Sequence, residues 1–347
     1  MRRNKPGPRR AEQAAVPGRV TMVDVARRAG VSQPLVSLVI GGNPRARVAD
    51  ATRQRILDAA RELGYRPNVI ARSLVRGRAY AVGLIIPDLG NPFFADVVRG
   101  AERVAADQGY ALLLCDAADV GIERHLETLR ARQIDGVIMD ALGAASLEAD
   151  AVAGLNIVLV DEPGAAFHGV ASDAFEAGRL AARHLLDLGH RRFGFLGPAS
   201  DIWAFRMRER GFVQELRAAG IAIDSPHFRR AAPTVDGGRD AMRTLLGLPN
   251  RPTAVFCAND LLALGALKSC ARSRVGVPET MSIIGCDDIE AARLVTPELS
   301  TITIPARELG ARAARMLIRL LDGESIRPAK PLPVALAARG TTGAAAS

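Results

Sequence analysis

Aspartate, asparagine or glycine recurs directly after short apolar runs in the larger, later part of this chain. In an open parallel sheet, ligands bind beyond the carboxyl ends of the strands, so these positions could together hold a ligand. The alternative is that each side chain caps the helix that follows its strand, and the residue types alone leave both interpretations open. The positions are Asp88, Asp116, Asp140, Asp161, Gly197, Asn259, Asp260 and Asp287.

The apolar runs themselves predict the elements that position those residues. From Ala81 onward the runs alternate with stretches of amphipathic helical pattern. Because the runs are continuously apolar, they fit strands that are buried on both faces of a parallel sheet. A doubly wound α/β body is therefore expected. The runs are AVGLIIP, ALLLCD, DGVIMD, NIVLVD, FGFLG, TAVFCAND and MSIIGCDD.

Positive charge is concentrated at the other end of the chain. The 347 residues carry a net charge of +9, yet residues 1–78 hold 17 Lys and Arg against five Asp and Glu, and the remainder holds 29 against 32. A basic end on a mildly acidic body is typical of a protein that binds the phosphate backbone of DNA. The alternative is a solvated, arginine-rich face.

This basic part predicts three short helices, over about residues 22–29, 33–40 and 50–63. Thr21, with Asp24 at the capping-box position, is the expected N-cap of the first helix, and Ser32 is that of the second. Apolar residues recur at helical spacing in all three, so the helices should share one core. A helix, a glycine-containing turn and a second helix form the helix-turn-helix arrangement.

The sequence disfavours several other classes of protein. No apolar run approaches the roughly 18 residues of a membrane span, and no signal-like stretch follows the basic start, so a cytoplasmic protein without a membrane segment is expected. The four cysteines are widely separated and the five histidines lack ligand spacing, so we expect no disulfide framework, metal or cofactor. Motifs of nucleotide-binding and hydrolytic enzymes are absent, which leaves a cytoplasmic doubly wound enzyme as a remote alternative.

The chain resembles the LacI/GalR family of bacterial transcription regulators over about residues 20–340. VDVARRAGVSQPLVSLV and TRQRILDAARELGYRPN are similar to the family's DNA-binding headpiece. The order and spacing of the family's sensor core are matched by GLIIPDLGNPFF, GHRRFGFLGP, RERGF, FCANDLLALGAL, GCDD and ELSTITIP. The resemblance implies a regulator, expected to be a repressor, with an all-α helix-turn-helix headpiece and a two-lobed, periplasmic-binding-protein-like (type I) α/β core.

Domain boundaries come with this resemblance. We expect a disordered basic tail (1–19), the helix-turn-helix domain (20–66), a hinge helix or linker (67–78), a ligand-sensing dimerisation core (79–340) and a short tail (341–347). Within the core, the first lobe would comprise about residues 79–174 and 304–333, and the second about 175–303 and 334–340.

The resemblance also implies contacts with double-stranded operator DNA. The second helix would enter the major groove, where Gln33 can pair with adenine, whereas Pro34 and Leu38 offer only apolar contact, for instance to a thymine methyl group. A family pattern often has Arg at the position of Leu38, so this chain lacks a guanine reader there. The candidate phosphate contacts are Thr21, Ser32, Ser37, Arg45 and Arg47.

The segment NVIARSLV resembles the family's hinge helix, with Asn68 as its cap and with Ala71 and Leu74 on the face that wedges into the minor groove. It is too short to be stable alone, so it should fold only on DNA beside a partner's copy. One helix-turn-helix unit contacts few bases, so a homodimer on a near-palindromic site is expected.

For the core, the resemblance implies a cleft that binds a small-molecule effector. Carboxylates and amides suit vicinal hydroxyls, an arginine can span two oxygens and an aromatic ring can cover a sugar, so a sugar or sugar derivative is expected. A purine or an acidic metabolite acting as corepressor is the alternative. Arg208 could instead pair with a carboxylate, and Trp203 could belong to the core. The expected effector contacts are Asp88, Phe93, Asp161, Trp203, Arg206, Arg208, Asn259 and Asp287.

Overall fold

The computed structural model describes residues 20–41, 48–65, 78–140, 152–164, 167–199, 202–223 and 225–345. The chain divides between Gly77 and Arg78 into two compact units, here called the head and the core. Some predictions lie outside the described residues. They concern the N-terminal tail, the phosphate contacts Arg45 and Arg47, and the hinge residues Asn68, Ala71 and Leu74.

The described residues of the head form α1 (Met22–Ala29), α2 (Gln33–Ile40) and α3 (Asp50–Glu62), which confirms the three predicted helices. Thr21 and Asp24 form the expected capping box, in which the Asp24 carboxylate accepts a hydrogen bond from the Thr21 backbone N–H at 3.0 Å. The expected side-chain cap of α2 is not formed. Ser32 precedes α2, but its side chain makes no capping hydrogen bond.

One small apolar core joins the three helices of the head. Val25 and Ala29 of α1, Val36 and Val39 of α2 and Ile56 of α3 are all buried in it. Helical periodicity places these residues on one face of each helix, so the opposite face of α2 is left to solvent.

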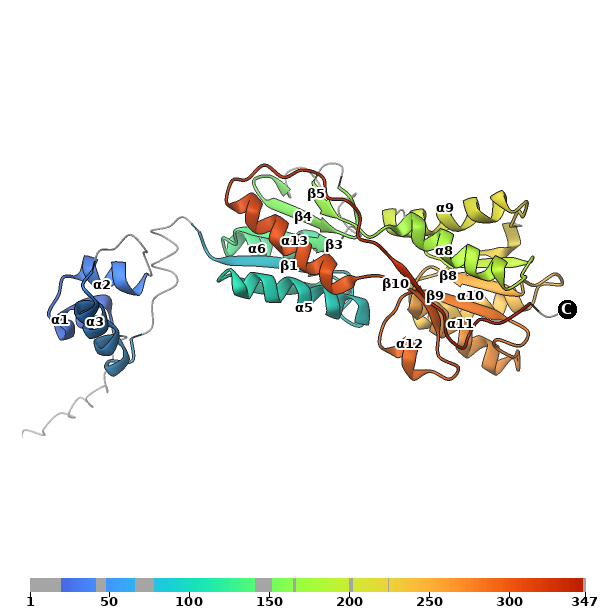
Figure 1. The fold of residues 1–347 in the computed structure, drawn as a ribbon, viewed down its shortest axis with the longest axis horizontal. Helices are drawn as coiled ribbons and strands as arrows, with labels where there is room; N and C mark the ends of the chain where they lie inside the picture. Colours follow the sequence, from blue (N-terminus) through green and yellow to red (C-terminus); the bar gives the residue numbers. More distant parts are fainter. Residues whose placement is uncertain are drawn as a thin grey trace, which may run out of the picture. The chain divides into compact units, whose positions relative to one another are not determined.

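The core contains two separate sheets. The first has the strand order β2-β1-β3-β4-β5, and every neighbouring pair in it is parallel. Helix α13 (Ala306–Leu321), which comes much later in the chain, packs beside α5 against this sheet (Figure 1). The other elements are β1 (Ala81–Ile86), α5 (Pro92–Asp107), β2 (Ala111–Asp116), α6 (Ile122–Ala131), β3 (Gly136–Asp140), β4 (Asn156–Val160) and β5 (His168–Val170).

The second sheet has the order β11-β10-β9-β8-β6-β7, in which only the pair β10–β11 is antiparallel. Its strands are β6 (Phe193–Gly197), β7 (Phe228–Arg230), β8 (Ala254–Cys257), β9 (Ser282–Asp287), β10 (Ser300–Thr303) and β11 (Ala335–Ala337). Its helices are α8 (Ala174–Asp187), α9 (Trp203–Ala218), the 3₁₀ turn η2 (Ser225–His227), α10 (Val235–Leu246), α11 (Asp260–Arg272) and the short α12 (Ala291–Leu294).

All seven predicted strands are present, and one of them differs in burial. No residue of β2 is fully buried, and Leu114 is 41% exposed, because β2 is an edge strand of the first sheet. Continuous apolarity therefore predicted the strand but not its place in the sheet. The three-residue strands β5 and β7 were too short to give a sequence signal.

The chain passes between the two sheets three times. It does so after β5, between β10 and α13, and between α13 and β11. The first and third passages are hydrogen-bonded to each other: Leu332 N–H donates to the Ala171 carbonyl at 2.8 Å, and Asp173 N–H donates to the Leu332 carbonyl at 2.9 Å. The division into two lobes that move against each other stays a prediction.

Helices α8 and α9 approach closely enough that only glycine fits at their contact. A Cβ atom on Gly178 of α8 would lie 1.9 Å from the carbonyl oxygen of Arg208, and one on Gly211 of α9 would lie 2.0 Å from that of Phe175. These contacts are too short for any other residue without a shift of a helix backbone. The glycine pair therefore fixes the position of α9 and of the arginine that it carries.

No helix in the described part of the chain is long and apolar enough to cross a membrane. The four cysteines are free thiols, of which Cys257, Cys270 and Cys286 are buried and Cys115 is half-buried. The burial of the first three is typical of cysteines that act as small apolar core residues.

Candidate functional site

The outer face of α2 brings together the residues that were predicted to contact bases. Gln33, Pro34 and Leu38 are all exposed, and so is Ser37, one of the predicted phosphate contacts. Val36 and Val39 point the other way into the head core. This face therefore presents one amide, one hydroxyl and two apolar side chains to whatever approaches it.

The two other described phosphate candidates, Thr21 and Ser32, stand at the N-terminal ends of α1 and α2. Both residues are exposed, and unpaired backbone N–H groups at helix starts favour an anion. The Thr21 hydroxyl is already engaged, because it donates to the Asp24 carboxylate at 2.7 Å. Of the two hydroxyls, that of Ser32 is the better placed to accept a new contact.

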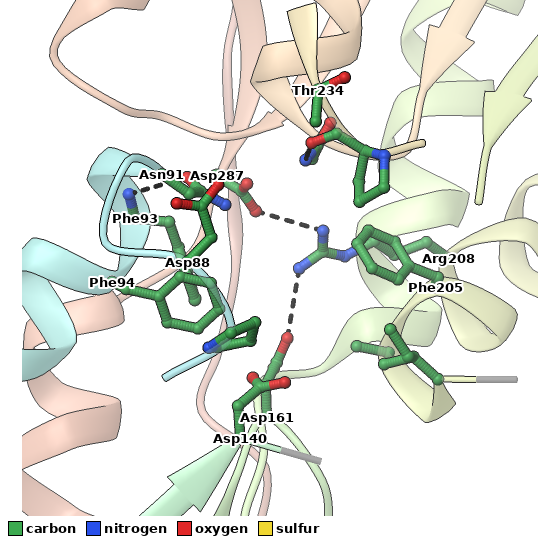
Figure 2. Close-up of a pocket in the computed structure, with 15 residues that line it drawn as sticks. Asp88, Asn91, Phe93, Phe94, Asp140, Asp161, Phe205, Arg208, Thr234 and Asp287 are labelled. Atoms are coloured by element: carbon green, nitrogen blue, oxygen red, sulfur yellow. Dashed lines mark hydrogen bonds and ion pairs between the residues drawn. The ribbon is translucent and has the colours of Figure 1, made fainter. Parts of the chain in front are cut away.

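A pocket in the core lies where the carboxyl ends of strands from both sheets meet. Asp88, Asp140 and Asp161 follow or end strands of the first sheet, whereas Asn259 and Asp287 do so in the second (Figure 2). This gathering is what the strand-end pattern predicted. The rest of the lining consists of Pro87, Asn91, Phe93, Phe94, Ile202, Ala204, Phe205, Arg208, Pro233 and Thr234.

Arg208 of α9 is the centre of this pocket and is only 2% exposed. One terminal guanidinium nitrogen donates to the Ala258 carbonyl at 2.7 Å and contacts the Asp287 carboxylate at 3.2 Å. The other contacts the Asp161 carboxylate at 3.4 Å, so that Figure 2 shows the guanidinium between two aspartates. The Arg208 Nε has no hydrogen-bond partner among the described residues. An ion pair thus joins the two sheets directly across the pocket.

Asp161 connects this ion pair to the first passage of the chain between the sheets. Its carboxylate accepts hydrogen bonds from the Ser172 hydroxyl at 2.7 Å and from the Ser172 backbone N–H at 3.4 Å. Its backbone has a left-handed φ of 57°, which aspartate adopts more readily than most residues. Asp161 therefore contacts both the ion pair and the first passage of the chain between the sheets.

Burial and neighbouring charges both shift the pKa values of Asp287 and Arg208, but they act in opposite directions on each group. Burial raises the pKa of Asp287 well above its ordinary value, although the Arg208 guanidinium acts against this rise. Burial by itself would lower the pKa of Arg208, yet the surrounding acidic groups raise it. The arginine is therefore held charged, and a ligand oxygen that replaced either carboxylate would meet a fixed cation.

Asn259 and Asp260 are neighbouring strand-end residues with different roles in the structure. The Asn259 side chain caps α11 by accepting from the Leu262 backbone N–H at 2.9 Å, and it also lines the pocket. Asp260 is wholly buried and does not line the pocket, and its carboxylate accepts from the Thr301 hydroxyl at 2.6 Å and from the Ile289 N–H at 2.9 Å. Asp260 therefore ties the second sheet together rather than facing a ligand.

Two predicted effector contacts are not among the residues that line the pocket. Trp203 is half-buried at the start of α9, and the exposed Arg206 lines a neighbouring depression with Phe195, Glu209 and Arg230. The reason is the phase of α9, whose buried face runs through positions 204, 208, 211 and 212. The aromatic ring that α9 contributes is that of Phe205, which lies 5.4 Å from the Arg208 guanidinium carbon.

The pocket also contains residues outside the predicted effector contacts, notably Asn91, Phe94, Asp140, Phe205 and Thr234. The sequence identifies Asp140 only as the end of a strand. The spacing of three between Phe205 and Arg208 could have identified Phe205, because residues three apart share one side of a helix.

Charge and shape limit what this pocket can hold. Four aspartates, Asp88, Asp140, Asp161 and Asp287, surround a single arginine, and three phenylalanines add apolar surface. No group of His, Cys, Asp or Glu in the described part of the chain is arranged to hold a metal ion. The set suits a ligand with hydroxyl groups and an apolar face.

Comparison with known proteins gives matches over most of the chain. A family model described as bacterial regulatory proteins, lacI family, matches residues 21–68, and a periplasmic binding protein-like domain matches residues 182–342. The HTH-type transcriptional repressor CytR of Escherichia coli K12 is 36% identical over 88% of this chain and 91% of its own length. The repressor PurR of Mannheimia succiniciproducens is 34% identical over 86% of this chain and 90% of its own length.

Solved structures give the same result. The lac repressor dimer bound to operator and the anti-inducer ONPF has a TM-score of 0.83 at 28% identity, covering 94% of this chain and 99% of that one. A CelR–cellobiose complex has a TM-score of 0.68 at 30% identity, covering 93% and 100%. A regulator from Enterococcus faecium with bound ribose has a TM-score of 0.69 at 32% identity, covering 76% and 99%.

These matches confirm the predicted fold and exclude the enzyme alternative, since the relatives are transcriptional repressors. The basic three-helix head and the two-sheet core are the two parts that such a regulator requires. The chain therefore belongs to the lacI family of bacterial regulatory proteins, as a transcriptional regulator with a periplasmic-binding-protein-like effector domain.

Proposed function

We propose that this regulator represses transcription by binding a near-palindromic operator as a homodimer, and that an uncharged, hydroxyl-rich small molecule in the core pocket changes its affinity for that operator. Operator DNA would be read by α2, with the hinge residues Asn68, Ala71 and Leu74 at the minor groove. Binding to chromosomal DNA requires a cytoplasmic location, which is part of the proposal.

The observation that carries this proposal is the pair of buried ion pairs that Arg208 forms with Asp161 and Asp287. Arg208 belongs to the second sheet, whereas Asp161 belongs to the first, and the ion pair between them is almost inaccessible to water. A ligand that exchanged hydrogen bonds with these groups would favour one orientation of the two sheets over another. Such a preference for one of two states is what an allosteric effector needs, and its differential affinity sets the size of the response.

Hydroxyl groups fit the polar lining better than anionic groups do. An effector with a phosphate or carboxylate would meet four aspartates and only one arginine, and that arginine is already paired with two of them. Sugar hydroxyls can accept from Arg208 and donate to the aspartates, while Phe93, Phe94 and Phe205 can cover an apolar sugar face. Two structurally similar regulators contain cellobiose and ribose, which supports the same class of ligand.

A purine is the second candidate effector, because a planar base could lie against the same three phenylalanines. The two candidates differ in the hydrogen bonds that they require. A sugar uses the aspartates as acceptors for several hydroxyls, whereas an unsubstituted base has few donors to satisfy them.

Titration of the full chain with paired probes tests this proposal. The sole tryptophan, Trp203, lies on the same helix as Arg208 and can report binding by its fluorescence. D-ribose, cellobiose and adenine should be compared with ribose 5-phosphate. We expect at least one uncharged sugar to bind and to change operator affinity, and ribose 5-phosphate to bind more weakly than ribose. Tighter binding of the phosphate ester would contradict the assignment of the ligand class.

A further inference from the structure

The outer face of α2 carries two parallel rows of side chains. Residues four apart lie one above the other on a helix, so Gln33 and Ser37 form a polar row and Pro34 and Leu38 form an apolar row beside it. All four residues are exposed, and Leu38 is 40% exposed although it is a large hydrophobic residue. Nothing in the head core requires these two apolar side chains, because Val36 and Val39 supply the buried face of α2.

Helix α2 also carries no charged residue, since its sequence is QPLVSLVI. The basic side chains in the described part of the head belong to α1 and α3, where Arg27, Arg28 and Arg61 are each paired with a carboxylate and where Arg53 and Arg55 also lie. In a helix-turn-helix head the second helix faces the base edges, so α2 cannot make the bidentate arginine contact that selects guanine. Hydrogen-bond readout by α2 is limited to Gln33 and Ser37.

We propose that Pro34 and Leu38 recognise the C5-methyl group of a pyrimidine in the major groove, whichever hydrogen-bonding edge that base presents. The proposal rests on the proposed function, in which α2 enters the major groove of operator DNA. Apolar side chains neither donate nor accept hydrogen bonds, so this row distinguishes bases only by the apolar surface that it can bury. Thymine and 5-methylcytosine both carry this methyl group, whereas uracil and cytosine do not.

The size of the effect follows from the area of one methyl group. Burial of a group of this size contributes enough to change an equilibrium constant about fourfold. A dimer that reads two equivalent half-sites would show up to about 16-fold, since separated positions contribute almost independently. Gln33, in the adjacent row, would select adenine by its bidentate amide, so adenine is expected close to the methylated position in each half-site.

The test separates the methyl group from the hydrogen-bonding edge. A bound site is first selected from random double-stranded DNA with the full chain. At each pyrimidine of the half-site, four versions are then compared by fluorescence anisotropy: T·A, U·A, 5-methyl-C·G and C·G. At one position, we expect T·A and 5-methyl-C·G to bind about fourfold more tightly per half-site than U·A and C·G, respectively.

Protein variants then assign the effect to a side chain. Leu38→Ala should abolish the difference between methylated and unmethylated versions, whereas Leu38→Met, which keeps an apolar side chain, should retain most of it. Leu57→Ala is the matched control, because Leu57 is also an exposed leucine of the head (38% exposed) but lies on α3. It should leave the methyl preference unchanged.

Two results would overturn this inference while leaving the proposed function intact. One is a selected site at which T·A and U·A bind equally at every position. The other is a methyl preference that persists in Leu38→Ala. Selection of no preferred site at all would instead contradict the proposed function, and this inference with it. The comparison of DNA versions uses the wild-type protein, so it holds even if a variant fails to fold.

Discussion

The head and the core depart from the usual distribution of side chains in opposite ways. In the head, the apolar Leu38 stands 40% exposed on a helix without charges, whereas in the core the charged Arg208 is 2% exposed between two aspartates. Folding alone favours neither arrangement, because large apolar groups gain from burial and charges lose by it. Each exception marks the surface that a partner would complete: base edges in the head and a small polar ligand in the core.

The largest expected effect comes from removing the buried charge of the core. Arg208→Met would leave Asp161 and Asp287 buried without their cation, which should destabilise the core by about 3–5 kcal/mol. Urea unfolding followed by circular dichroism would measure this loss, and titration would show loss of effector binding.

Arg210→Met provides the control for this prediction, because Arg210 lies on the same helix but is exposed. It should change stability by no more than about 0.5 kcal/mol. If both variants were equally stable, the buried network would not have the role assigned to it.

A second prediction concerns pH and the buried carboxyl of Asp260. Burial raises its pKa from 3.8 to about 6, so the folded state binds this proton more tightly than the unfolded state does. Its stabilising contribution is fully present below about pH 3.8 and is lost as the pH rises to about 6. Roughly two pKa units correspond to about 3 kcal/mol.

Asp260→Asn isolates this contribution, because an amide keeps an acceptor for the Ile289 N–H and offers a donor to Thr301. We expect the free energy of unfolding of wild type, relative to Asp260→Asn, to fall between pH 4 and pH 6 and then to level off. Parallel pH profiles of the two proteins would show that Asp260 does not titrate in this range.

The smallest effect is expected in the head. Thr21→Ala removes one side of the capping box of α1 and should cost about 1 kcal/mol of stability, whereas Thr21→Ser keeps the hydroxyl and should cost little. If Thr21 acts only as a cap, folded Thr21→Ala should bind the operator as tightly as wild type does. A strong loss of affinity in folded Thr21→Ala that Thr21→Ser restores would assign the hydroxyl to DNA contact instead.

Sequence patterns anticipated the fold because its elements follow from local rules. Continuous apolar runs identified seven strands, and the Thr21–Asp24 spacing identified the start of α1. Position within a sheet did not follow, as β2 shows, because edge strands and central strands can have the same composition. The three-residue strands β5 and β7 depend on pairing with distant strands rather than on their own sequence.

The pocket was anticipated less completely because it depends on contacts between distant residues. Asp161, Arg208 and Asp287 are all among the predicted effector contacts, but their ion pairs join residues 47 and 79 positions apart. The aromatic residue of α9 depends on helix phase, which places Phe205 in the pocket lining and leaves Trp203 out of it. A difference of two residues along a helix changes the side that a side chain faces by about 200°.

Operator binding by the full wild-type chain, with and without effector, tests the central claim most directly. Anisotropy of a labelled selected site should be measured at a fixed moderate salt concentration, against unrelated DNA of equal length. We expect at least about 10³-fold tighter binding to a symmetric site, and a shift of about 5-fold to 150-fold when an uncharged sugar occupies the pocket. Equal affinity for both DNAs, unchanged by any of the ligands, would contradict the central claim.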